Sequence, residues 1–176
     1  MNRHAKADKS ALLVSANPNI EDAENYASNL FNLRANYGNL KFVDVEVESI
    51  NQVLTKRRLF KKRKHTDVLK SSVITERELK SLDLQNYEYV HIASHGVHDE
   101  ENPRYSGLLL GADKESKEDG ILQAHEIFPY KLSADLITLS SCFSGFGEID
   151  PNEGNMGIYR SFLIAGAKSV IISLWN

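Results

Sequence analysis

Cysteine is nearly absent from this sequence: Cys142 is the only one among 176 residues, so no disulfide can form within the chain. With four prolines and ten glycines, the chain also lacks the composition of long disordered segments. No apolar run approaches the roughly 20 residues that a membrane-spanning helix needs. The polar N-terminus and the short apolar run at 11–16 do not form a signal peptide. We therefore expect a globular, cytoplasmic protein without membrane contact.

An excess of charge of either sign is lacking as well. The chain has 21 basic and 24 acidic residues, a formal net charge of −3, which indicates no particular partner. The segment 56–64, KRRLFKKRK, is the exception because it contains no acidic residue. It is typical of a solvated loop or helix face. It also fits a connector open to proteolysis, or a docking patch for an acidic protein or a nucleic acid, so a nucleic-acid partner stays open.

The pattern of apolar residues predicts strands that alternate with helices. We expect strands at 11–16, at 41–49 with one wetter face, at 88–94, at 135–141 and, buried, at 168–175. Helical spacing predicts helices at 19–38 and 154–166, and the capping box TERE at 75–78 predicts a short helix that buries Leu79 and Leu82. An extended segment is expected at 106–111, and a loop with a short helix at 120–128. This order predicts an α/β fold whose mostly parallel central sheet is flanked by helices on both faces.

Two of the predicted strands end at residues that can carry chemistry. His95 and Gly96 follow the strand at 88–94, and Cys142 follows the strand at 135–141. In parallel sheets ligands bind beyond the carboxyl ends of the strands, so neighbouring strands would bring the imidazole and the thiol to one edge. There the imidazole could take the thiol proton and create a nucleophile. The backbone N–H groups of Gly96 and Cys142 are candidates for stabilising an oxyanion.

The spacing of the two residues agrees with this hypothesis. His95 precedes Cys142 by 47 residues, close to the caspase arrangement, although the local caspase signature around the cysteine is absent.

Other hypotheses fit the same residues. A lone cysteine is most often a buried small hydrophobe. His91 lies mid-strand and is expected to be a buried structural histidine, whereas His98 is expected to be a solvated loop residue. A zinc site made by His95, His98 and Cys142 would have an incomplete ligand set, so no metal or cofactor is predicted. A flavodoxin-like binder would explain the strand and helix order, but neither strand-end residue.

Several segments around these residues resemble the CHAT domain family, caspase-like peptidase domains often attached to TPR repeats. They are HIASHG at 91–96, LSSCFSG at 139–145, EGNMG at 153–157, FLIAGA at 162–167 and VIISLW at 170–175. The resemblance is specific over 88–175 and looser over 11–87. It implies a caspase/hemoglobinase-like three-layer fold and a cysteine endopeptidase, with His95 as general base and Cys142 as nucleophile.

The resemblance also implies a biological setting. Such prokaryotic domains often serve as effectors switched on by a sensor, including in antiviral defence. We therefore expect limited proteolysis of a specific protein substrate, and a regulatory domain or protein of the TPR type as partner. The alternative is a catalytically idle caspase-like scaffold or interaction module.

Two departures from related families qualify these expectations. Metacaspases carry an aspartate two residues before the cysteine and favour a basic residue before the cleaved bond; Ser140 stands there in this chain, so that preference is not predicted. CHAT domains continue past the strand at 168–175. We therefore expect residues 1–176 to form a single domain that lacks its C-terminal part. Either the sequence is truncated, or it is the larger product of caspase-style processing with a companion C-terminal fragment.

Overall fold

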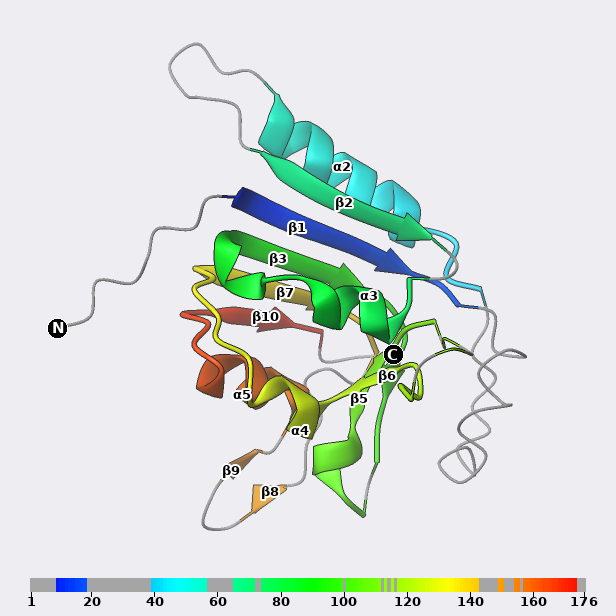
Figure 1. Ribbon diagram of the computed structural model, residues 1–176, viewed down its shortest axis with the longest axis vertical. Coiled ribbons are helices and arrows are strands. Elements are labelled where there is room, and N and C mark those ends of the chain that lie inside the picture. The colour runs from blue at the N-terminus through cyan, green and yellow to red at the C-terminus, as the bar shows by residue number, and fades with distance from the viewer. Residues whose placement is uncertain are drawn as a thin grey trace, which may run out of the picture.

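The computed structural model describes residues 9–18, 39–56, 65–71, 74–99, 101–111, 113, 115, 117–142, 149–150, 154–155 and 157–173. Within these ranges a five-stranded sheet lies at the centre, in the order β10-β7-β3-β1-β2 (Figure 1). Its strands are β1 (Lys9–Ala16), β2 (Thr66–Ser71), β3 (Tyr87–Ala93), β7 (Leu136–Ser140) and β10 (Val170–Ile172). Every pairing in it is parallel, so the predicted α/β fold with a parallel sheet is confirmed.

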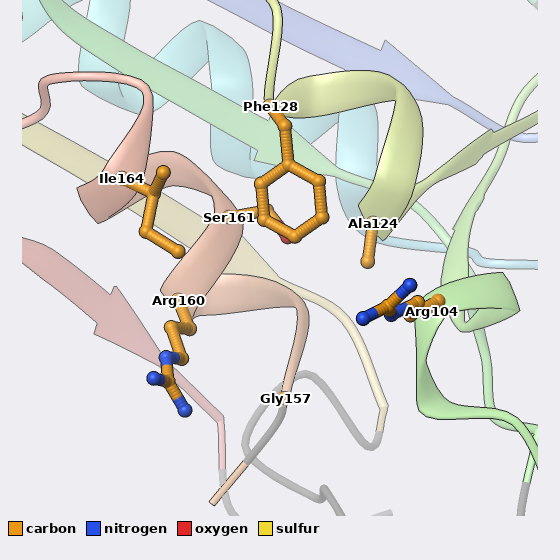
Figure 2. Close-up of a pocket in the computed structure, with 7 residues that line it drawn as sticks. All are labelled: Arg104, Ala124, Phe128, Gly157, Arg160, Ser161 and Ile164. Atoms are coloured by element: carbon orange, nitrogen blue, oxygen red, sulfur yellow. The ribbon is translucent and has the colours of Figure 1, made fainter. Parts of the chain in front are cut away.

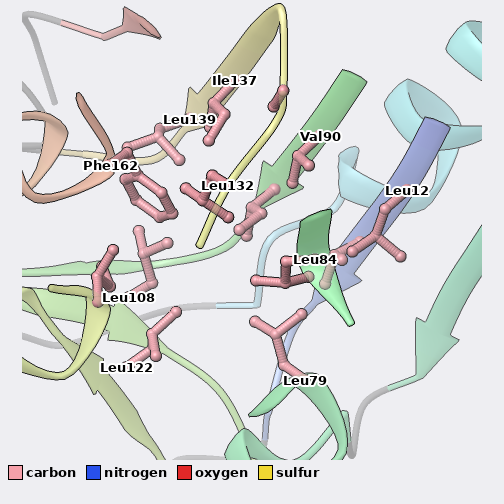
Figure 3. Packing of buried hydrophobic residues seen from close by; sticks show 14 of the residues in the cluster. Leu12, Leu79, Leu84, Val90, Leu108, Leu122, Leu132, Ile137, Leu139 and Phe162 are labelled. Carbon is pink, nitrogen blue, oxygen red and sulfur yellow. The ribbon is translucent and has the colours of Figure 1, made fainter. Parts of the chain in front are cut away.

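Helices cover both faces of this sheet. The larger hydrophobic cluster joins one face to α3 (Glu76–Ser81), α4 (Ala124–Ile127) and α5 (Ile158–Ile164), through Leu79, Ile127 and Phe162 (Figure 3). A smaller cluster joins the other face to α2 (Val43–Thr55). Strand β1 serves both, because Leu12 belongs to the larger cluster and Leu13 to the smaller one. This alternation produces the three layers expected of a caspase-like fold.

Two smaller sheets lie outside the central one. Strands β4 (Gly96–Val97), β5 (Gly107–Leu109) and β6 (Ile121–Gln123) form an antiparallel sheet, and β8 (Ile149–Asp150) pairs with β9 (Gly154–Asn155). Two short 3-10 helices, η1 (Leu84–Asn86) and η2 (Pro103–Tyr105), complete the described elements. The strand β4 begins immediately after His95, so the three-stranded sheet is attached directly to the carboxyl end of β3.

The expected strand at 41–49 is wrong, because this segment begins helix α2. A strand would place Val43, Val45 and Val47 on one face. In the helix Val43 and Val47 are buried, whereas Val45 is 60% exposed. Ile50 and Leu54 continue the buried stripe and pack against the same cluster. Val43 and Val47 are four residues apart, a spacing that fits one face of a strand and also one face of a helix. The apolar pattern over these residues therefore did not distinguish the two.

Other boundaries also differ from the prediction. The second central strand is β2, which the apolar pattern did not reveal. The last strand, β10, lies at one edge of the described sheet with Ile171 55% exposed, so the expectation of a buried strand is wrong. The expected loop before the helix at 120–128 contains β6. The capping box at Thr75 is confirmed. The predicted helix at 19–38 and residues 57–64 of the basic segment lie outside the described residues.

Candidate active site

The strands that lead to His95 and Cys142 are neighbours. Strands β3 and β7 pair in parallel, with Ala93 opposite Ser140. The pairing continues past the strand ends, because the Ser94 N–H donates to the Ser140 carbonyl at 3.2 Å. Extended by two residues, this register places His95 opposite Cys142. The structure therefore brings both predicted residues to the carboxyl edge of the sheet.

Gly96 lies directly against the backbone of Cys142. A Cβ atom added at Gly96 would lie 1.8 Å from the carbonyl oxygen of Cys142 and 3.0 Å from its carbonyl carbon. Real Cβ atoms essentially never approach another heavy atom within 3.0 Å. Only glycine fits here, which gives a physical reason for the glycine after the histidine: it lets the two strand ends touch.

His95 is held in place, whereas Cys142 is partly accessible. His95 is 6% exposed, and its carbonyl accepts hydrogen bonds from the Leu109 N–H at 2.9 Å and from Ser94 Oγ at 3.2 Å. Cys142 carries a free thiol and is half-buried. A cysteine that served only as a core hydrophobe would be fully enclosed, which Cys142 is not.

A polar group lies on the same sheet face, immediately behind the strand-end pair. Glu46, in the first turn of α2, accepts a hydrogen bond from Ser140 Oγ at 3.1 Å through Oε2. Its other oxygen, Oε1, lies 3.3 Å from Nε2 of His91. Asp44, in the same turn of α2, accepts a hydrogen bond from Ser15 Oγ on β1. Sequence reasoning missed both carboxylates because it assigned their segment to a strand.

His91 is a buried structural histidine, as expected. It is 5% exposed, and burial lowers its pKa, an effect that the Glu46 carboxylate only partly offsets. The imidazole is therefore neutral at pH 7. Its Nε2 has no hydrogen bond from any residue that the structure describes.

His98 is half-buried rather than fully solvated, and its Nδ1 lies 3.4 Å from Ser106 Oγ. Among the described residues, the group of three that could ligate a metal does not include His95, His98 or Cys142. It consists of Glu76, Glu118 and Glu126.

These three carboxylates surround Lys80, on the face opposite α2. Lys80 Nζ lies 2.5 Å from Glu76 and 2.6 Å from Glu126, and it also donates to Glu118. Glu76 is 1% exposed, and burial raises its pKa to about 8, while hydrogen bonds to these carboxylates raise the pKa of Lys80 despite its burial. Glu118 and Glu126 thus help to balance the Lys80 charge, while burial disfavours the charged form of Glu76. Because an ammonium already occupies the centre, the cluster is a structural ion pair rather than a metal centre.

A separate pocket of 130 Å³ lies between α4, α5 and η2 (Figure 2). Arg104 and Arg160 approach it from different elements, and Phe128 and Ile164 supply apolar lining. Ala124, Gly157 and Ser161 complete it. None of the residues predicted for catalysis lines this pocket, so it is distinct from the strand-end pair.

The fold and the strand-end pair define a class: an α/β protein with a five-stranded parallel sheet and flanking helices, consistent with a caspase-like fold. The family model of the CHAT domain matches residues 1–176. The chain therefore belongs to the CHAT domain family, a family of caspase-like peptidases, as the sequence motifs indicated. A search of curated proteins found no match. Among the described helices, none has the length and apolar character to cross a bilayer.

Proposed function

We propose that this chain is a cysteine endopeptidase in which His95 is the general base and Cys142 the nucleophile. The observation that carries the proposal is the contact between the two strand ends, where Gly96 meets the Cys142 backbone with no room for a side chain. Such a contact fixes the residue after the imidazole against the residue that bears the thiol. Membership of a caspase-like peptidase family supports the same assignment.

The proposed chemistry follows from these two groups. His95 removes the proton from the Cys142 thiol, and the resulting thiolate attacks the carbonyl carbon of the scissile peptide bond. The C–N bond then breaks, and the imidazolium gives its proton to the leaving amine. Water attacks the thioester with His95 again as base, which releases the carboxylate product and restores the thiol.

The oxyanion that forms during attack needs hydrogen-bond donors. We assign this role to the backbone N–H groups of Gly96 and Cys142, because the two residues are adjacent in space at the strand ends. Removal of one such donor typically costs about 100-fold or more in rate. Backbone donors cannot be deleted by ordinary substitution, so their contribution is inferred from the geometry that Gly96 maintains.

The proposed substrate is a specific protein that is cut once or at few positions, in a cell where a regulatory partner switches the peptidase on. Antiviral defence is one setting for such an effector. The support is the family assignment alone, so the substrate must be found by experiment.

The test compares wild-type chain with Cys142→Ala by degradomics, in the presence of the proteins encoded beside it. We expect Cys142→Ala to abolish cleavage of the substrate while its circular dichroism spectrum and melting temperature stay unchanged, because the half-buried thiol contributes little packing. A peptidyl electrophile should label Cys142 in the activated wild-type protein. Undiminished cleavage by Cys142→Ala would refute the assignment. Absence of labelling under every activating condition would favour an idle scaffold or interaction module.

A further inference from the structure

Glu46 connects the two strands that end at His95 and Cys142. One carboxylate oxygen accepts the hydrogen bond of Ser140 on β7, and the other faces the imidazole of His91 on β3. The carboxylate itself comes from a third element, the first turn of α2. A single side chain thus spans β3 and β7 from above the sheet.

We call the contacts of Glu46 with Ser140 and His91 the Glu46 bridge. It lies next to the proposed catalytic pair, on the side away from the carboxyl edge of the sheet. In the sheet register Ser15, Ala93 and Ser140 form one row across β1, β3 and β7. Two residues further toward the carboxyl edge, just beyond the ends of β3 and β7, the same register would place His95 beside Cys142. At the ends of these strands, the bond from Ser94 N–H to the Ser140 carbonyl and the contact at Gly96 hold the two segments together. Glu46 therefore acts where the backbone ladder between β3 and β7 is ending.

The surroundings of Glu46 differ from those of an ordinary surface carboxylate. Its neighbour His91 is buried, and the Nε2 of that imidazole has no hydrogen bond from another described residue but lies 3.3 Å from this carboxylate. Glu48, two residues further along α2, instead pairs with Lys70 on β2 at the surface. The same helix thus offers one carboxylate that reaches the site and one that does not.

We propose that Glu46 is a positioning residue that holds β3 and β7 together behind His95 and Cys142. This inference rests on the proposed function, since it concerns the geometry of that pair. Glu46 acts through Ser140 and His91 and needs no contact with the substrate. Displacement of reacting groups by about 1 Å can reduce a rate by about 100-fold, so a bridge that limits such displacement has a measurable effect.

The experiment uses the reactivity of the thiol, which requires no known substrate. Cys142 is the only cysteine, so the mass increase on alkylation by iodoacetamide reports this residue alone. The rate is measured on the full chain at pH 7 for wild type, Glu46→Ala, Glu46→Gln, Ser140→Ala and the matched control Glu48→Ala. Melting curves show that each variant is folded at the assay temperature.

We expect Glu46→Ala to react about 10-fold more slowly than wild type, and Glu48→Ala to stay within about twofold, because only Glu46 contacts β3 and β7. Glu46→Gln should recover most of the rate, since its amide can still accept from Ser140 and reach His91. Ser140→Ala should lower the rate by about threefold, and it should have no further effect when combined with Glu46→Ala, because both changes break the same bridge.

Equal rates for Glu46→Ala and Glu48→Ala would overturn the inference, as would a Glu46→Gln variant that is folded but as slow as Glu46→Ala. If Glu46→Ala does not fold, a wild-type rate in Ser140→Ala would overturn it instead. A wild-type rate no faster than that of the urea-unfolded chain would count against the catalytic pair itself. A fast wild-type rate that is insensitive to Glu46 would count against the bridge alone.

Discussion

Substitution of Gly96 by alanine is the most direct test of the contact between the two strand ends. The added methyl group would lie 1.8 Å from the carbonyl oxygen of Cys142, and the obstacle is backbone rather than a side-chain end that could rotate away. To reach even the 3.0 Å limit, the two segments must separate by about 1.2 Å. The separation occurs between the residue that follows His95 and the residue that bears the thiol.

The cost can be estimated from two contributions. Overpacking by one methyl group typically costs about 1–3 kcal/mol, and the upper end applies here because both partners are backbone. Loss of the hydrogen bond from Ser94 N–H to the Ser140 carbonyl would add about 1 kcal/mol. We therefore expect Gly96→Ala to lower the free energy of unfolding by about 3–4 kcal/mol. In the molecules that remain folded, a displacement above 1 Å should reduce Cys142 alkylation by at least about 10-fold.

Gly107→Ala is a matched control for the loss of stability. A Cβ atom at Gly107 would meet Ile121 Cγ2 and the Leu122 carbonyl oxygen, both at 2.6 Å. This clash lies between β5 and β6 of the antiparallel sheet, and none of its three nearest atoms belongs to Cys142. Urea denaturation of both variants gives the free energy of unfolding, and iodoacetamide labelling below the transition gives the thiol reactivity. Gly107→Ala should lose stability yet retain the wild-type labelling rate.

The refuting result is a Gly96→Ala protein that is as stable as wild type and labels at the same rate. Such a result would mean that the strand ends do not touch as described, and the main support for the proposed pair would be lost. A variant that loses stability but keeps the wild-type labelling rate would show that the contact matters for folding and not for the site.

Two predictions concern other parts of the fold. Burial raises the pKa of Glu76 from 4.5 to about 8, so the folded chain retains a proton that the unfolded chain releases, and stability should fall as the pH rises from about 4.5 to 8. In a pH series of urea denaturations, Glu76→Gln should flatten this slope. At pH 8 its free energy of unfolding should exceed that of wild type by about 1.4 kcal/mol or more, which is the value of one pKa unit. An unchanged slope would contradict the assignment. In α2, Val47→Ala should cost about 1–3 kcal/mol and Val45→Ala less than about 0.5 kcal/mol, because only Val47 is buried. If thermal unfolding shows equal losses of stability for the two variants, residues 43–47 form a strand and not a helix.

Elements could be predicted from the sequence where the local residue pattern agrees with the burial that the fold imposes. Strand β3 is mostly buried, and β7 buries alternate residues; both are short runs rich in apolar residues, so their positions and their strand-end residues could be predicted. The capping box at Thr75 is a local hydrogen-bond pattern that does not depend on the rest of the chain. The adjacency of β3 and β7 followed only as an expectation from the fold class, and the structure was needed to establish it.

Helix α2 shows why the remainder could not be predicted. Valine favours strands, and alternation of Val43, Val45 and Val47 with acidic residues satisfies the strand pattern. The choice is made by tertiary packing, because the stripe through Val47, Ile50 and Leu54 covers the smaller cluster. Once the segment is helical, Glu46 turns toward β3 and β7. The wrong secondary structure thus concealed the contacts of Glu46 with β3 and β7 as well as the helix itself.

The strand period of two also separates the site from most of the core. On β3, Val90 and Ile92 pack into the larger cluster, whereas Tyr89 and Ala93 belong to the face covered by α2. His91 on β3 and Ser140 on β7 lie on the second face, where the Glu46 carboxylate contacts both. Substitutions in the larger cluster, for example at Phe162, should therefore affect activity through stability alone. Under the proposed function, substitutions in the first turn of α2 alter the geometry of the proposed pair, His95 and Cys142, while the larger cluster stays intact.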